Sequence, residues 1–152
     1  MRQDSRLSRM LHVLIHMGRH DGAMTSEMIA QMLDANPVVI RRTMAGLRDE
    51  GYVSSVKGHG GGWTLARSLE ELTLLDIYHA VGEPSFFAIG PAYDMPGCLI
   101  EQAVNGVLKD VFNEAEELLR KRLGGVTLAD VANGFPIATD HGGGKQCASK
   151  AQ

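Results

Sequence analysis

Residues 36–67 read NPVVIRRTMAGLRDEGYVSSVKGHGGGWTLAR, and the prediction of the fold starts from this stretch. The Asn-Pro pair suits the start of a helix, because asparagine can cap free N–H groups and proline needs no N–H in the first turn. Apolar residues then recur at helical spacing from Val38 to Leu47, and Gly51 ends the segment. The first part of the stretch therefore predicts a helix.

After Gly51 the apolar period changes from helical to two. Residues 52–57 and 63–67 alternate in this way and predict two strands. The glycine-rich residues 58–62 between them predict the tip of a β-hairpin. A phosphate-binding loop would lead from a strand into a helix and carry Gly-Lys-Ser/Thr, so the hairpin fits this segment better.

Two more helices are expected before this stretch. Residues 5–20 have apolar residues at helical spacing, and a short helix follows Thr25, which is a plausible N-cap. Three helices followed by a two-stranded hairpin are typical of a winged helix-turn-helix. A further helix, opened by the capping-box pattern at residues 73–76, completes a predicted DNA-binding domain over residues 1–83.

The remainder of the chain predicts a long helix with a broad apolar face. Residues 84–97 are rich in proline and glycine and predict a loop, and residues 98–135 predict a dimerisation helix with a short terminal helix. Residues 136–152 are polar and glycine-rich, which predicts a disordered tail. The fold class is thus mainly α with a small β-hairpin: a winged helix-turn-helix domain plus a long dimerisation helix. The face expected to bury against a second copy comprises Leu99, Ala103, Val107, Val111 and Leu118.

The composition is that of a soluble globular chain. The 152 residues are 44% hydrophobic and 22% charged. Two cysteines, Cys98 and Cys147, exclude a disulfide scaffold and a four-cysteine zinc site. No apolar run approaches the roughly 20 residues of a membrane helix, and the start is too polar for a signal peptide. We therefore expect a cytoplasmic protein that has no membrane partner.

The charge is unevenly distributed along the chain. The net charge of −3 argues at first against a nucleic-acid partner. Residues 1–67, however, hold nine basic and six acidic residues, a net +3, whereas residues 68–152 hold six basic and twelve acidic residues, a net −6. This asymmetry indicates a basic working part and an acidic remainder.

The third helix and the wing supply the candidate DNA contacts. A recognition helix presents its N-terminal residues to base edges, and arginine binds guanine through two hydrogen bonds. The wing can reach phosphates or the minor groove through basic side chains and backbone N–H groups. The alternatives are a solvated helix face and glycines that only permit positive φ. The candidates are Asn36, Pro37, Val38, Arg41 and Arg42 on the helix and Lys57, His59, Gly60 and Gly61 on the wing.

Other residues with chemical potential lie outside this region. His12, His16 and His20 recur every four residues and suggest a metal face, but no acidic or thiol partner accompanies them, so hydrogen-bonded histidines are favoured. Cys98 opens the long helix, whose N-terminus favours a thiolate and hence a redox sensor; the alternative is a small buried residue. No catalytic constellation is present, and an enzyme is not expected.

The segment from Leu47 to Arg67 resembles the signature of the Rrf2 family of bacterial transcription regulators: helix end, strand, glycine-rich wing and return strand. Residues 72–77 (LTLLDI) and 126–131 (VTLADV) match further family patterns, and residues 36–42 (NPVVIRR) resemble its YwnA-type branch. The resemblance implies a homodimer, in which the long helix crosses to the other subunit, on a pseudo-palindromic operator of double-stranded DNA.

One departure from the family concerns its cofactor. Members that sense iron or nitric oxide hold an iron–sulfur cluster with three cysteines before the long helix, whereas residues 84–98 here contain Cys98 alone. No stable cluster is expected, and Cys98 is the candidate signal residue. The expected function is a sequence-specific, homodimeric repressor that responds to oxidation. A metal or iron–sulfur sensor and a winged-helix protein-interaction module remain as alternatives.

Overall fold

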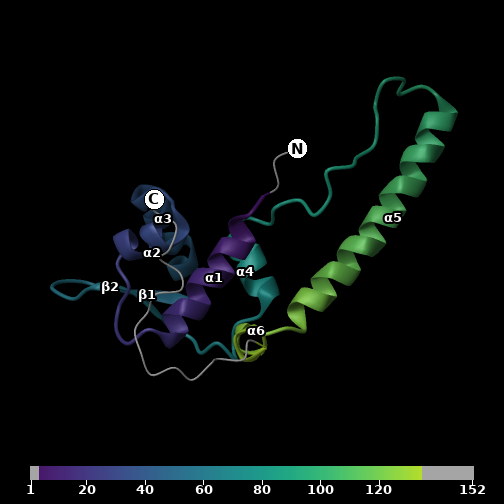
Figure 1. Ribbon diagram of the computed structural model, residues 1–152. Helices are drawn as coiled ribbons and strands as arrows, with labels where there is room; N and C mark the ends of the chain where they lie inside the picture. Colours follow the sequence, from purple (N-terminus) through teal and green to yellow (C-terminus); the bar gives the residue numbers. More distant parts are fainter. Residues whose placement is uncertain (1–3, 135–152) are drawn as a thin grey trace, which may run out of the picture.

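The computed structural model describes residues 4–134, which form six helices and one two-stranded antiparallel sheet. Figure 1 shows a winged-helix body from which one long helix extends. The expected fold class, mainly α with a small β-hairpin in a winged helix-turn-helix, is confirmed, and each helix and strand predicted within these residues is present. In chain order the elements are α1 (Arg6–Arg19), α2 (Ser26–Leu33), α3 (Pro37–Asp49), β1 (Val53–Val56), β2 (Gly62–Leu65), α4 (Leu74–Ala80), α5 (Leu99–Gly124) and α6 (Leu128–Asn133).

Local capping residues define the turn between α2 and α3. The Thr25 hydroxyl accepts a hydrogen bond from the Met28 N–H at 3.1 Å and so caps α2. Asp34 ends α2 in the left-handed conformation, with φ of 49°. The Asn36 side chain then accepts from the Val38 N–H at 2.8 Å, and Pro37 occupies the first turn of α3, as the sequence predicts.

The wing is fastened to the helices by a contact that the sequence analysis did not predict. Its two strands pair with Val53 opposite Leu65 and Val56 opposite Gly62. Met24, just before α2, exchanges two backbone hydrogen bonds with Trp63, at 2.8 and 3.0 Å. The indole N–H of Trp63 donates to the buried Ser26 hydroxyl at 3.0 Å. The base of the hairpin is therefore joined directly to the start of α2.

One core unites α1 to α4, the wing and α6. Thr73 and Thr127 form an isolated backbone bridge, and Arg19 donates to the Ala132 carbonyl at 2.6 Å. The sequence grouped α6 with the long helix in a segment of residues 98–135, but the structure places it in the core of the winged-helix body, because the chain returns to that body after α5. The fully buried large side chains of the described residues are Val13, Leu14, Ile29, Met44, Leu47, Val53, Leu72, Ile77 and Leu128.

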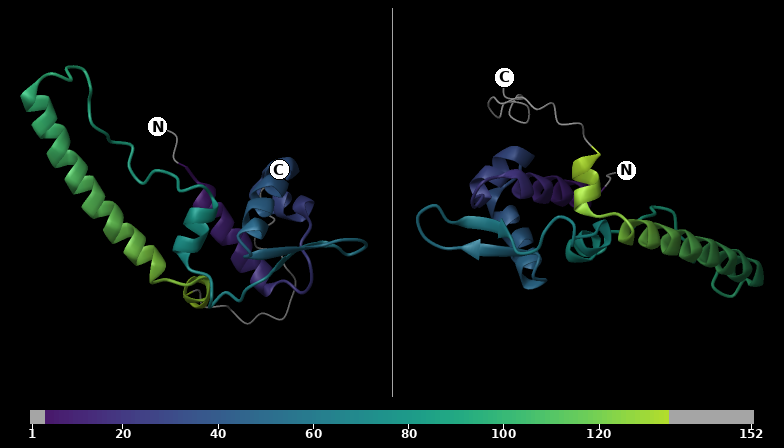
Figure 2. Two further views of the ribbon diagram at one scale, coloured as in Figure 1. Left: turned by 180° about the vertical axis from the view of Figure 1, so that it is seen from behind. Right: turned by 90° about the horizontal axis from the view of Figure 1, so that it is seen from below.

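Helix α5 extends away from this body, as both views in Figure 2 show. The loop of residues 84–97 leaves α4, runs to the distal end of α5, and so lets α5 return towards α6 (Figure 1). Side chains of α5 hold the end of the loop: Gln102 donates to the Pro96 carbonyl at 2.8 Å, and Asn105 donates to the Ala92 carbonyl at 2.7 Å.

The tail of residues 136–152 and Cys147 lie outside the described residues. Among the helices in residues 4–134, none has the length and apolar character that crossing a membrane requires.

Candidate nucleic-acid interface

The two faces of α3 differ in burial. Ile40, Met44 and Leu47 are buried against the other helices, as their spacing predicts. The opposite face leaves Arg41 and Arg42 exposed, and Asn36 is exposed at the start of the helix. Pro37 is half-buried, and Val38 is exposed. The five candidate residues of this helix therefore lie at its N-terminal part, with all but Pro37 open to solvent.

The adjacent arginines have different surroundings. Arg41 forms an ion pair with Glu27 of α2. Among residues 4–134, no ion pair involves Arg42. The carboxylate neutralises one of the two charges and orients the Arg41 side chain, while Arg42 keeps its full hydrogen-bonding capacity for a partner. Sequence reasoning treated the two residues alike, because nothing in the chain order brings Glu27 to α3.

The wing tip presents basic side chains but fewer backbone donors than expected. Lys57, His59 and Gly60 are exposed, and Gly60 has φ of +74°. The Gly61 N–H donates to the Gly58 carbonyl at 3.0 Å, inside the hairpin. Gly61 is thus not an available phosphate donor, which corrects one of the two backbone contacts predicted for this loop.

A groove of about 300 Å³ connects α3 with the wing. Glu27 and Arg41 lie on its helical side, and Ser55 and Val56 of β1 lie on its hairpin side. The helix and the wing, which are separate in sequence, therefore share one continuous surface that carries Arg41. The complete lining is Thr25, Ser26, Glu27, Arg41, Ser55, Val56, Gly61, Gly62 and Trp63.

A second surface lies along α5, which contains no buried residue. Leu99 is 78% exposed and Val107 is 64% exposed, and both belong to the face predicted to meet a second copy. A hollow of about 350 Å³ on this helix is lined by apolar side chains: Ala103, Val104, Val107 and Leu108. The other members of the predicted face are exposed as well: Ala103, Val111 and Leu118.

The junction of α4, the loop and α5 is held by aromatic and ionic contacts. The Phe86 ring stacks on Tyr78 at 4.6 Å between centroids, and the Arg120 guanidinium lies 5.2 Å from the Tyr78 ring centroid. Glu83 accepts hydrogen bonds from His79 and from Arg120, at 2.8 and 3.0 Å. These donors hold the pKa of Glu83 below its ordinary value, with the His79 bond as the larger cause.

Within residues 4–134 of a single chain, Cys98 and the three histidines do not form a metal site. Cys98 is the half-buried N-cap residue of α5, and its backbone N–H donates to the Met95 carbonyl at 2.9 Å. The His12 and His16 rings meet edge to face at 4.7 Å, and burial lowers the pKa of His16. Within residues 4–134, no three histidine, cysteine or acidic side chains come together in a way that could hold an ion.

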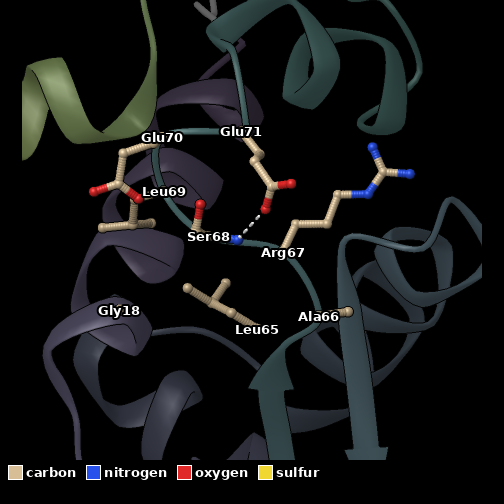
Figure 3. Close-up of a pocket in the computed structure, with 8 residues that line it drawn as sticks. All are labelled: Gly18, Leu65, Ala66, Arg67, Ser68, Leu69, Glu70 and Glu71. Atoms are coloured by element: carbon tan, nitrogen blue, oxygen red, sulfur yellow. Dashed lines mark hydrogen bonds between the residues drawn. The ribbon is translucent and has the colours of Figure 1, made fainter.

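A further hollow, of about 490 Å³, lies at the end of β2 beside α1. Figure 3 shows that the Glu71 carboxylate turns towards the Ser68 N–H, to which it is bonded at 3.0 Å, whereas Arg67 and Glu70 point in opposite directions. The charged groups do not converge on a common point, and none of the predicted DNA contacts lines this hollow.

The comparison with protein families agrees with this architecture. The model of the Rrf2 family, described as iron-dependent transcriptional regulators, matches residues 3–134. The chain belongs to the Rrf2 family. As a member of this family it is a transcriptional regulator with a helix-turn-helix.

Individual Rrf2 relatives extend the similarity over most of the chain. YwnA of Bacillus subtilis (strain 168), described as an HTH-type transcriptional regulator, is 28% identical over 131 residues, covering 86% of this chain and 96% of YwnA. A protein from Lactobacillus plantarum described as a transcriptional regulator has a TM-score of 0.70 with 27% identity, covering 85% and 88% of the two chains. IscR of T. potens has the same fold, with a TM-score of 0.67, 21% identity and 94% coverage of both.

The family description implies iron, and the donor set of this chain does not fit the cluster that three cysteines would hold. Cys98 is the one thiol among residues 4–134, and it sits at a helix cap with no group of candidate ligands around it. An iron–sulfur cluster takes thiolate ligands, typically four, or histidine substitutes. Residues 4–134 therefore lack the three-cysteine ligand set, while the helices and the wing of the family fold are all present.

Proposed function

We propose that this Rrf2 regulator is a homodimeric repressor that binds a specific operator in double-stranded DNA, and hence works in the cytoplasm. The observation that carries the proposal is the exposed N-terminal part of α3, with Arg42 unpaired among the described residues and the groove joining it to the wing. Arginine on such a helix can bind guanine in the major groove, while Lys57 on the wing can reach a phosphate.

The homodimer is supported by the exposure of the α5 face. A soluble chain rarely leaves a continuous apolar surface along a whole helix, because its hydration is unfavourable. A second α5 offers a surface of the same chemistry, as a two-fold interface requires. Dimerisation also brings two winged-helix bodies to one DNA molecule, which suits a palindromic site.

Operator selection tests the proposal. The full chain is used to select sequences from a random DNA pool, and the affinity for the selected operator is measured with the parent protein and with the double variant Arg41→Ala, Arg42→Ala. We expect the double variant to lose at least about 30-fold in affinity, since one specific arginine contact in each of the two subunits, at about 1–3 kcal/mol apiece, amounts to about 2 kcal/mol or more. Repression is then tested with a reporter gene placed behind the selected operator.

Arg48→Ala is the matched control. Arg48 lies near the end of α3 and pairs with Asp49 at 3.0 Å, so this variant removes one positive charge from the same helix but not from its N-terminal part. It is expected to retain operator affinity within a few-fold. A winged helix that serves only protein contacts predicts no selected sequence, or an affinity that is the same in the double variant, and either result would reject the proposal.

The proposal includes a signal at Cys98 rather than a resident cluster. Oxidation of the Cys98 thiol by hydrogen peroxide gives a sulfenic acid and one molecule of water. The added oxygen would stand at the N-cap of α5, where the loop meets the helix, and we propose that it lowers operator affinity. Operator binding is measured before and after peroxide treatment of the parent and of Cys98→Ser; an equal response of both proteins would contradict this role.

Iron analysis of anaerobically purified protein tests the cluster alternative, which predicts bound iron and colour.

A further inference from the structure

Two valines at the start of α3 are exposed without a structural reason. Val38 is 65% exposed and Val39 is 57% exposed, while the core face of the same helix is formed by Ile40, Met44 and Leu47. Valine is a weaker helix former than alanine, so helix formation does not explain two β-branched residues in the first turn. These side chains contribute neither to the described core nor to helix propensity.

Two of the polar side chains beside the valines already form hydrogen bonds within α3. The Asn36 side-chain oxygen Oδ1 accepts from the Val38 N–H at 2.8 Å, and Pro37 has no N–H to donate. The Thr43 hydroxyl donates back to the Val39 carbonyl at 3.0 Å. The first turn of α3 thus offers a mainly apolar surface to whatever it meets.

The major groove has one prominent apolar feature, the C5-methyl group of thymine. We infer that Val38 and Val39 select thymine in the operator by contact with this methyl group. The inference rests on the proposed function and deepens it, since it names the base that this turn of the helix reads.

The helix geometry also places this thymine relative to a guanine. Val38 and Arg42 are four residues apart and share a helix face, about 6 Å apart along the axis. Successive base pairs are about 3.4 Å apart, so the two side chains span no more than about two base steps. The operator half-site therefore carries a thymine within about two base pairs of a guanine that Arg42 contacts.

Replacement of thymine by deoxyuridine tests this inference, because it removes the methyl group and nothing else. Each thymine of the selected operator is replaced in both half-sites, and affinity is measured with the full chain. For the contacted position we expect about fourfold loss per methyl group, hence about 15-fold for the dimer. The variant Val38→Ala, Val39→Ala should bind both DNAs equally within about twofold, with an unchanged salt dependence, since no phosphate contact is lost.

Ile89→Ala is the control, because Ile89 is an exposed aliphatic residue of the loop before α5 and lies outside the groove between α3 and the wing. It should keep the full response to deoxyuridine. The inference is overturned if no thymine shows a methyl effect, or if the effect persists in the double valine variant. An operator that depends on Arg42 but ignores deoxyuridine would overturn this inference alone, whereas failure to select any sequence would overturn the proposed function and this inference together.

Discussion

At the residue scale, Arg41 and Arg42 illustrate how neighbours in sequence acquire different roles. Glu27 pairs with Arg41 and leaves Arg42 available. Both partners of the pair are exposed, so the pair contributes little to stability. Its larger consequence is electrostatic, because the Glu27 carboxylate reduces the positive charge that Arg41 presents on this face of α3.

Glu27→Gln is predicted to strengthen non-specific DNA binding. The variant removes one negative charge and frees Arg41, so affinity for unrelated duplex DNA should rise about fivefold at low salt. The slope of log K against log salt should steepen by about 0.9 per subunit, as one more phosphate contact forms. Glu70→Gln, which removes an exposed carboxylate outside this groove, serves as the control. An unchanged slope in Glu27→Gln would show that Arg41 does not gain a phosphate.

A second residue-scale prediction concerns the buried bond between Trp63 and Ser26. Ser26→Ala leaves the indole N–H without its acceptor at a buried position, so the free energy of unfolding should fall by about 1–3 kcal/mol. Urea denaturation measures the loss. Ser54→Ala, on the exposed side of β1, should change stability by less than about 0.5 kcal/mol. Equal effects of the two variants would mean that the bond contributes nothing.

At the element scale, the wing depends on a close approach of two backbones. Gly62 has φ of +150°, and a Cβ there would lie 2.6 Å from the Met24 carbonyl oxygen. Gly60 also has positive φ, but a Cβ there would meet nothing within 4 Å. A side chain at Gly60 would therefore cause backbone strain alone, whereas one at Gly62 would also clash with the Met24 backbone.

Gly62→Ala is accordingly predicted to destabilise the protein more than Gly60→Ala. We expect a loss of about 3 kcal/mol for Gly62→Ala, because the wing must move away from Met24, and about 1 kcal/mol for Gly60→Ala, from φ strain alone. Urea unfolding of both variants provides the comparison. Similar losses would indicate that the Met24 bridge is not rigid enough to exclude a methyl group.

At the scale of the whole molecule, we expect α5 to serve dimerisation, whereas the winged-helix body contains the core that keeps each chain folded. Val107→Glu places a charge on the exposed apolar face, and we predict a shift from dimer to monomer in sedimentation experiments. Operator affinity should fall about 100-fold or more, since the second half-site is no longer tethered. The helical circular dichroism should persist, because Val107 contributes nothing to the described core. Asn113→Glu introduces the same charge at an exposed polar position and should leave the dimer intact.

Much of this architecture could be predicted because its signals are local. The Asn36 cap with Pro37, the Thr73 capping box and the change of period after Gly51 each depend on residues within a few positions of one another. Each of these patterns acts on the backbone of its own segment, so it determines helix ends and strands independently of the tertiary contacts. The candidate DNA contacts of α3 follow from the same local patterns.

The tertiary structure decided what depends on distant residues meeting. It joined Glu27 to Arg41, fastened the wing through Met24 and Trp63, and placed α6 in the winged-helix core. It also used the Gly61 N–H inside the hairpin, so that this group is not available to phosphate. By itself, the sequence determined the elements, their order and the exposed apolar face of α5. Tertiary packing determined which side chains contact one another, because contacts between residues far apart in the chain produce no periodic pattern in its sequence.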